Sequence, residues 1–311
     1  MSRNRPTKQH YVPACYLREW AKIPIFSKKD PFVWIIDRKT KNKRRDKVKN
    51  VLTSNDLYTI KINGKKNYVI EETLANLEGE YAKIFKEKIS KHIPLNEKEH
   101  IILCTFTAVM MQRTLRNKNS LENFIDQIIS HSGGLEKAHD LEPSESERLK
   151  SIKKDIHKQS VFSNLEKITN ILLNMGLAFL CAEKGVEYLT SDDPCNLFNP
   201  DLQWQKFYGP GLAQKNVQVT LPLSPKIMLC LSWTNLRGYI KWDKKHVEDS
   251  NRMLVGHCYQ YFISSNSKIK RMWYHKYPLD LFFIIKIIKN KTKLYIIHLK
   301  TKFRYLHVSK K

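Results

Sequence analysis

The sequence lacks the cysteine spacings that bind zinc or build a disulfide framework. Its six cysteines are scattered singly, at positions 15, 104, 181, 195, 230 and 258. None belongs to a Cys-x-x-Cys pair, and none stands at zinc-finger spacing from a histidine. This pattern argues against zinc fingers and disulfide-rich secreted domains, and we expect reduced, mostly buried thiols.

Long apolar runs are also missing. No run approaches the ~20 residues that a helix needs to span a bilayer, and the start, MSRNRPTKQH, contains no apolar signal region. We therefore expect a cytoplasmic protein without a transmembrane segment. Hydrophobic residues still make up 41% of the 311 residues, enough to bury a sizeable core.

Acidic residues are scarce relative to basic ones, 30 against 55, which gives a net charge of +25. Residues 1–50 hold 15 Lys or Arg against 4 acids, and residues 266–311 hold 13 against 1, whereas the 215 residues between them carry 27 against 25. Two basic ends flanking a nearly neutral body favour a polyanionic partner, with nucleic acid first and an anionic membrane surface second. The alternative is a lysine-, isoleucine- and asparagine-rich composition that reflects genomic bias alone.

The first 70 residues predict a short helix followed by a small antiparallel sheet. Pro13 suits a first helical turn, where its missing N–H is not needed, so residues 13–21 form the expected helix. Its inward face would carry either Cys15, Tyr16 and Trp20 or Leu17 and Trp20. Strands are expected at residues 31–37, 48–52, 57–62 and 68–70.

Helical periodicity dominates residues 71–182. Residues 71–90 place apolar side chains on one stripe, and residues 97–116 are apolar almost all round, which is typical of a buried central helix. Asn96 and Glu99 form its expected capping box. Further helices are expected at residues 121–129 and 163–182, and the charged residues 136–158 predict an exposed helical insert.

The rest of the chain returns to strands. They are expected at residues 186–189, 217–221, 227–233 and 261–264, with one helix at residues 245–260. Strands at residues 279–288 and 294–299 predict a basic hairpin with interleaved aromatics, which could stack bases and hold phosphates or be a sheet edge protected by lysines.

The predicted fold class is α+β, with a central helical core and antiparallel β-hairpin elements on its N- and C-terminal sides. We expect a single domain over residues 1–266, which includes the insert, and a basic C-terminal β-hairpin extension over residues 267–311.

Several polar residues lie where elements begin or end. His10 precedes the first helix on a segment biased toward extended geometry, either as part of a site or as a structural histidine that satisfies a backbone group. Glu71 and Glu72 cap the next helix, while Glu78 shares a face with Glu71 and could converge with it on a ligand.

Arg113, at the end of a buried helix, needs an acidic partner or an anionic ligand. Residues 190–194, TSDDP, form a turn whose side chains can bond nearby backbone amides.

Five segments occur in a characteristic order. They are QHYVPACYLREW at 9–20, VIEETLANLEGEYAKI at 69–84, FTAVMMQRTLRN at 106–117, YLTSDDPCNLF at 188–198 with VTLPLSP at 219–225, and VEDSNRMLVGHCYQYFISSN at 247–266. Through them the chain resembles domain-of-unknown-function family 4238 over residues 8–266, most specifically in its His-Tyr-x-Pro-x-x-Tyr-Leu opening and its Thr-Ser-Asp-x-Pro turn. The family often has asparagine after the turn aspartate, where this chain has Asp193.

The resemblance implies no activity, but it implies that dispersed polar residues belong together. These are His10, Glu72, Glu78, Gln112, Arg113, Ser191, Asp192 and Asn251.

We expect a nucleic-acid-acting protein, such as a phosphodiesterase or nuclease. His10 would act as acid or base, and Arg113 would stabilise phosphate charge. Asp192, with Glu72 or Glu78, would orient the imidazole or hold a divalent ion, although no cofactor is assigned. The residues expected to bind substrate are Gln112, Ser191, Asn251, Tyr11, Arg18 and Arg116.

Two alternatives remain open. One is a non-catalytic nucleic-acid-binding module, in which the polar cluster only braces the core. The other is a defence or toxin effector that acts on a small molecule.

Overall fold

The computed structural model describes residues 7–22, 30–62, 64–139, 144–199, 202, 209–234 and 236–274. The chain divides into two units, Met1–Trp273 and Tyr274–Lys311. Every element that positions the candidate site belongs to the first unit. The strands expected at residues 279–288 and 294–299 lie outside the described residues.

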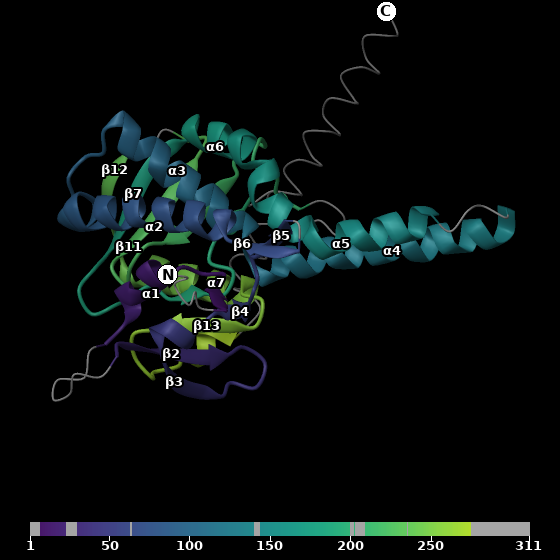
Figure 1. Cartoon of the computed structure of the whole chain (residues 1–311). Helices are drawn as coiled ribbons and strands as arrows, with labels where there is room; N and C mark the ends of the chain where they lie inside the picture. Colours follow the sequence, from purple (N-terminus) through teal and green to yellow (C-terminus); the bar gives the residue numbers. More distant parts are fainter. Residues whose placement is uncertain are drawn as a thin grey trace, which may run out of the picture. The chain divides into compact units, whose positions relative to one another are not determined.

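Helices and mainly antiparallel sheets make up the first unit, which confirms the predicted α+β class (Figure 1). None of the described helices is long and apolar enough to cross a membrane. The helices are α1 (Ala14–Leu17), α2 (Val69–Glu87), α3 (Glu97–Gln112), α4 (Leu115–His139), α5 (Ser144–Ser163), α6 (Leu165–Leu173) and α7 (Lys244–His257), with 3₁₀ turns η1 (Arg18–Trp20), η2 (Val48–Asn50), η3 (Ile89–Lys91) and η4 (Arg271–Tyr274).

The described strands are β1 (Lys8–His10), β2 (Phe32–Asp37), β3 (Lys43–Lys47), β4 (Thr53–Asn55), β5 (Ile60–Ile62), β6 (Lys65–Asn67), β7 (Gly176–Ala182), β8 (Thr190–Ser191), β9 (Asn196–Phe198), β10 (Gln218–Pro222), β11 (Ile227–Ser232), β12 (Gly238–Trp242) and β13 (Tyr261–Ser264). The larger sheet has the order β12-β7-β11-β10-β9 and is antiparallel except between β12 and β7. The smaller sheet, β3-β2-β13-β8, joins the N-terminal hairpin to strands from the second half of the chain. Strands β1 and β4 form a separate two-stranded sheet, and so do β5 and β6.

The segment after His10 connects the N-terminus to the rest of the core. As expected from Pro13, a helical turn follows, and α1 continues into η1. The Tyr16 hydroxyl donates a 2.6 Å hydrogen bond to the carbonyl of Pro222 in β10. Trp20 Nε1 donates a 2.9 Å bond to the carbonyl of Tyr188, two residues before β8. Both aromatic residues are fully buried, which confirms that they face inward.

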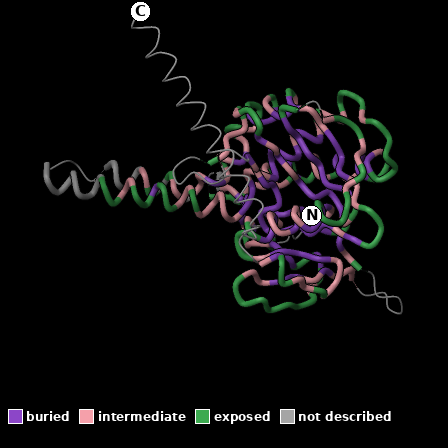
Figure 2. The backbone as a smooth tube through the Cα atoms, turned by 180° about the vertical axis from the view of Figure 1, so that it is seen from behind, coloured by how far each residue is buried: buried purple, intermediate pink, exposed green. Residues whose placement is uncertain are grey.

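Helices α2 and α3 and the larger sheet share one cluster of buried side chains. Tyr81 of α2 stacks on Phe106 of α3 with ring centroids 3.8 Å apart. The predicted capping box starts α3, since Glu99 N donates to Asn96 Oδ1 and Asn96 N donates to the Glu99 carboxylate. Many buried residues lie in this region, while many of the exposed residues lie in loops (Figure 2).

The helix expected over residues 163–182 is wrong in its second half. Helix α6 ends at Leu173, and residues 176–182, GLAFLCA, form strand β7. This strand lies between β11 and β12 inside the sheet, so it is a continuous apolar run. Such a run cannot be distinguished from a buried helix by periodicity alone.

Several short strand predictions also fail. Residues 48–50 form η2 instead of a strand, residues 186–189 belong to no strand, and β6 followed by α2 replaces the strand expected at residues 68–70. Only residues 60–62 of the expected strand at 57–62 pair as β5. Short strands depend on cross-strand partners that are distant in sequence, which local pattern does not reveal.

Helix α4 runs further than expected. Instead of ending near residue 129, α4 continues through Gly133 and Gly134 to His139. It lies beside α5, so the helical insert predicted at residues 136–158 is part of a longer helical hairpin (Figure 1). Packing against a partner helix overrides the low helix propensity of the two glycines.

Candidate functional site

A hollow of about 550 Å³ opens beside β1, η2 and α2. Its size lies within the roughly 300–1,000 Å³ of most small-molecule sites. The ionisable side chains that line it are those of Lys8, His10, Lys49, Glu71, Glu78 and Arg113, together with the Tyr58 hydroxyl. We call it the His10 pocket.

His10 is held by both its backbone and its ring. It pairs with Thr53 through the β1–β4 ladder, and its Nε2 lies 3.0 Å from the carbonyl oxygen of Val48. A carbonyl only accepts, so Nε2 carries a proton in this bond and the neutral ring keeps its lone pair on Nδ1. Burial lowers the pKa of His10, which favours that neutral form at pH 7. The ring is therefore suited to act as a base.

Arg113 is a buried residue of the pocket lining. It lies at the break between α3 and α4, and its side chain is 3% exposed. Its guanidinium donates to the Glu78 carboxylate at 2.7 Å, to the His10 carbonyl at 2.6 Å and to the Tyr58 hydroxyl at 3.4 Å. Burial would lower the pKa of Arg113, but Tyr58 and Glu78 raise it above its usual value. Since these donors are committed to the protein, Arg113 positions the His10 backbone.

Gln9 and Glu71 complete the polar wall. Gln9 Nε2 donates to the Glu71 carboxylate at 2.8 Å and to the Thr59 hydroxyl at 2.9 Å, while its Oε1 accepts from the backbone N–H of Tyr58. Glu72, which the sequence analysis favoured, is exposed, and Glu71 lines the pocket instead. Adjacent helical residues point about 100° apart, so only one of the two can face inward. The shared face of Glu71 and Glu78 was the signal that identified the correct residue.

His157 of α5 lies behind the pocket lining, against Tyr58. Its ring is 3% exposed and stacks on Tyr58, with the ring centroids 6.2 Å apart. Burial, with Lys118 and Arg113 nearby, lowers the pKa of His157 from 6.5 to about 4. The helical hairpin of α4 and α5 therefore contributes a side chain, His157, that contacts Tyr58, and Tyr58 is hydrogen-bonded to Arg113.

Acid should destabilise the protein through His157. In the unfolded chain this ring takes a proton as the pH falls below about 6.5, but in the folded chain only near pH 4. Stability is therefore lost as the pH falls through this window, by roughly 3 kcal/mol at about 1.4 kcal/mol per pKa unit. Urea unfolding of His157→Phe between pH 7 and pH 4 should show a correspondingly smaller loss, whereas the exposed-histidine control His246→Gln should behave like the wild type. Equal pH slopes for His157→Phe and the wild type would refute this assignment.

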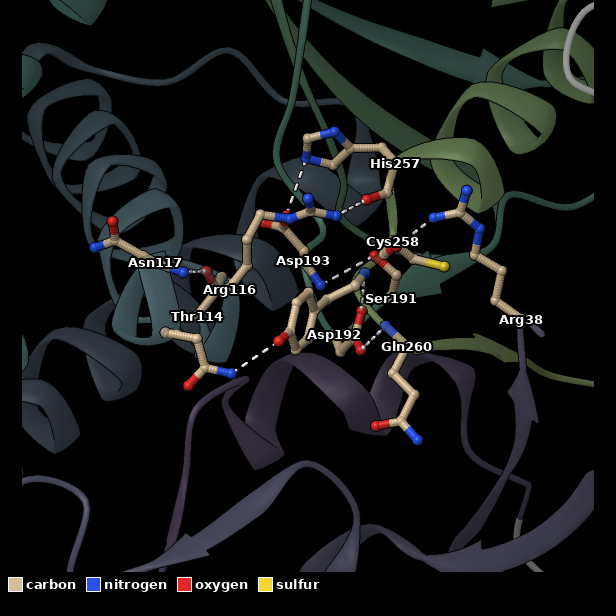
Figure 3. Close-up of polar contacts among 12 residues, drawn as sticks. Arg38, Thr114, Arg116, Asn117, Ser191, Asp192, Asp193, His257, Cys258 and Gln260 are labelled. Carbon is tan, nitrogen blue, oxygen red and sulfur yellow. Dashed lines mark hydrogen bonds and ion pairs between the residues drawn. The ribbon is translucent and has the colours of Figure 1, made fainter. Parts of the chain in front are cut away.

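The TSDDP turn forms a second polar cluster, with Asp192 at its centre (Figure 3). One carboxylate oxygen accepts from the backbone N–H of Tyr259 at 2.8 Å, and the other from those of Gln260 and Tyr261 at 2.7 and 2.8 Å. Burial raises the pKa of Asp192, and these bonds offset part of that effect. The Ser191 hydroxyl accepts from the Asp193 N–H, so the expected side-chain bonding to backbone amides is confirmed.

Asp193 carries the ion pairs of this cluster. Arg116 Nε donates to its carboxylate at 2.5 Å, and His257 Nε2 lies 3.1 Å from the same oxygen (Figure 3). Arg116 also donates to the carbonyl of His257 and lies over the ring of Tyr259. Arg113 and Arg116 thus each have an acidic partner, and only Arg113, which is buried, requires one.

The remaining substrate-binding candidates have other surroundings. Asn251 braces the backbone, accepting from Leu189 N–H and donating to Glu187 O. Gln112 accepts from the Asn117 side chain. Arg18 is exposed on η1. Burial raises the pKa of Tyr11, and Asp192 and Tyr58 raise it further, so Tyr11 lies close to both clusters.

The structure therefore brings the candidates into two groups. His10, Glu78 and Arg113 meet in the His10 pocket, while Ser191, Asp192 and Arg116 meet at the turn. Asp192 does not line the His10 pocket, because its carboxylate is turned to three backbone N–H groups. Within the part of the chain that the structure describes, no group of three or more His, Cys, Asp or Glu side chains is placed to hold a metal ion.

These features define a class of protein: an α+β fold in which an N-terminal His-Tyr-x-Pro segment, α2 and the end of α3 build one polar pocket. The sequence model of a family described as "Protein of unknown function (DUF4238)" matches residues 8–268. The chain belongs to that family, which confirms the resemblance found in the sequence. Searches of curated proteins and of solved structures gave no match.

Proposed function

We propose that the protein acts on a phosphodiester of a nucleic acid, with His10 as the general base. The observation that supports this most directly is the state of its ring. The Val48 carbonyl fixes the proton on Nε2, burial favours the neutral ring, and Nδ1 keeps a lone pair beside a polar hollow. In this proposal Nδ1 takes a proton from a hydroxyl or water as its oxygen attacks phosphorus. The P–O ester bond on the opposite side breaks, and the leaving oxygen departs with the bonding pair and takes a proton from water.

The cations for the phosphate are the lysines of the pocket. From the sequence, Arg113 was expected to stabilise phosphate charge, but its guanidinium is buried and bonded within the protein. Lys8 and Lys49 line the same hollow and are both exposed, and the ion pair that Lys49 makes with Asp30 at 2.8 Å lies on the surface. We therefore give phosphate binding to these lysines, and Arg113 the positioning of His10.

A basic strand leading into the pocket supports a nucleic-acid partner. Strand β3, KRRDK, exposes its lysines and arginines, and it continues directly into η2, which contains Val48 and Lys49. Arg45 lies over the rings of Phe32 and Trp34, at 5.3 and 5.8 Å from their centroids. Cationic and aromatic side chains together hold single strands through phosphate contact and stacking.

Replacing His10 tests the proposal. His10→Gln keeps an N–H near the position of Nε2, and so the bond to Val48, but removes the base. We expect cleavage of end-labelled RNA or DNA to fall by about 10²–10⁴-fold, with melting temperature and strand binding retained. His246→Gln, at an exposed position, serves as the control and should cleave like the wild type.

Two outcomes would count against it. Undiminished cleavage by His10→Gln would remove His10 from the mechanism. Wild-type protein that binds strands with a steep salt dependence but never cleaves them would instead favour the second candidate, a non-catalytic binding module based on β3.

A further inference from the structure

A second hollow, of about 540 Å³, lies where α6 passes into β7 and where the chain leaves β11. Its wall is made by residues 173–177, by Trp233, Thr234 and Arg237, and by His100 in the first turn of α3. None of these residues lines the His10 pocket or joins the Asp192 turn. We call it the Trp233 hollow.

The loop on one side of this hollow is placed by direct backbone contact. A Cβ added at Gly176 would lie 2.5 Å from the Thr234 carbonyl oxygen and 2.9 Å from that of Leu236. Only glycine allows the loop to approach β7 this closely. The Ser232 hydroxyl also accepts from the backbone N–H of Thr234. The close approach of Gly176 and the Ser232 hydroxyl therefore fix the backbone of Thr234, next to Trp233.

Trp233 is anchored at its edge but exposed. Its Nε1 donates a 2.8 Å hydrogen bond to the carbonyl of Leu212, yet the residue remains 41% exposed. A large aromatic ring left open to solvent and held in one orientation is suited to stacking against another flat ring. The apolar side chains of Leu173, Met175 and Leu177 lie in the same wall.

The charge of the wall favours an anion. Arg237 is exposed, and among the described residues no acidic side chain lines the hollow and none pairs with Arg237. Burial lowers the pKa of His100, so its ring is neutral at pH 7 and Arg237 supplies the positive charge. A guanidinium binds phosphate well because its planar set of donors matches two oxygens at once.

We propose that the Trp233 hollow binds a nucleotide, with its base stacked on the indole of Trp233 and its phosphate held by Arg237. The nucleotide is either free or one unit of a nucleic-acid strand. The proposal does not depend on cleavage at His10, because the two hollows share no lining residue.

Calorimetric titration of the full chain tests this with four probes: AMP, adenosine, inorganic phosphate and a five-nucleotide single strand. We expect AMP or the pentanucleotide to bind more tightly than adenosine or phosphate. Trp233→Ala should weaken that binding about tenfold, and Trp233→Phe, which keeps a ring, should restore most of it. Arg237→Gln should weaken AMP binding but not the binding of adenosine. Lys241→Gln, which removes an exposed charge from the adjoining strand β12, is the matched control and should bind like the wild type.

The outcomes separate the possibilities. Tight AMP binding that Trp233→Ala weakens identifies a free-nucleotide site, whereas binding of the pentanucleotide alone identifies a strand subsite in this hollow only if Trp233→Ala weakens it. Phosphate that binds as tightly as AMP, or Trp233→Ala and Arg237→Gln variants that bind like the wild type, would overturn the proposal. Nucleotide binding retained in His10→Gln shows that this site stands even if the cleavage proposal fails.

Discussion

Arg113→Met is expected to lower the free energy of unfolding by about 3–5 kcal/mol, the usual cost of removing one partner from a buried ion pair. Methionine fills much of the same space but donates no hydrogen bond. Glu78 would lose its partner at the pocket wall, and the His10 carbonyl would lose a 2.6 Å bond. Equilibrium unfolding in urea at pH 7 measures the change.

A matched variant separates this effect from the general loss of a cation. Arg45→Met removes an exposed arginine on β3 and should change stability by only about 0.5–1 kcal/mol, the value of an exposed cation–π contact such as those with Phe32 and Trp34. Glu78→Gln combined with Arg113→Met should cost less than the sum of the single changes, because the two residues contact one another. Strict additivity, or an Arg113→Met variant as stable as the wild type, would contradict the role assigned to this pair.

Asp192→Ala is the second large expected effect. Its carboxylate accepts from three backbone N–H groups, those of Tyr259, Gln260 and Tyr261, and the residue is 3% exposed. Alanine would leave these donors without a partner, and each buried unsatisfied donor costs about 1–3 kcal/mol. We expect a loss of about 1–3 kcal/mol in the free energy of unfolding, because the three donors are only partly buried and removing the carboxylate also relieves its desolvation, which outweighs these bonds in raising its pKa.

The same measurement on Asp126→Ala provides the comparison. Asp126 is 53% exposed and pairs with Lys153 on the surface of the helical hairpin, where such a pair contributes about 0–1 kcal/mol. Hydrogen exchange adds a local readout, since the amide protons of residues 259–261 should exchange faster in Asp192→Ala. Unchanged exchange at these amides would show that the carboxylate does not hold them.

Much of the site was visible in the sequence. The His-Tyr-x-Pro segment indicated a strand-to-helix corner at His10, the shared face of Glu71 and Glu78 predicted that both carboxylates could converge, and Arg113 at the end of an apolar helix predicted an acidic partner. The structure shows all three features. The corner at His10 and the shared face of Glu71 and Glu78 could be read because each depends on residues close together in the sequence. For Arg113 the sequence showed the need for a partner, but not that the partner is Glu78, 35 residues earlier.

Other features could not be read in this way. The sequence placed Asp192 with His10, but its carboxylate is taken up by backbone amides about 70 residues further along the chain. It placed phosphate binding on Arg113, whose donors are bonded to His10, Tyr58 and Glu78. Gln9 and Tyr58 in the pocket, and the whole Trp233 hollow, also depend on contacts between distant segments.

The sequence by itself determined the α+β class, the family, the capping of α3 and the helices that carry Glu78 and Asn251. Periodicity and caps depend on neighbours along the chain, so these features are local. Tertiary structure alone decided which polar groups meet and which ones already have partners. It placed residues 176–182 in a sheet, turned Asp192 toward backbone amides and brought Arg113 to the backbone of His10, because buried donors and acceptors are satisfied by whichever segment packs against them.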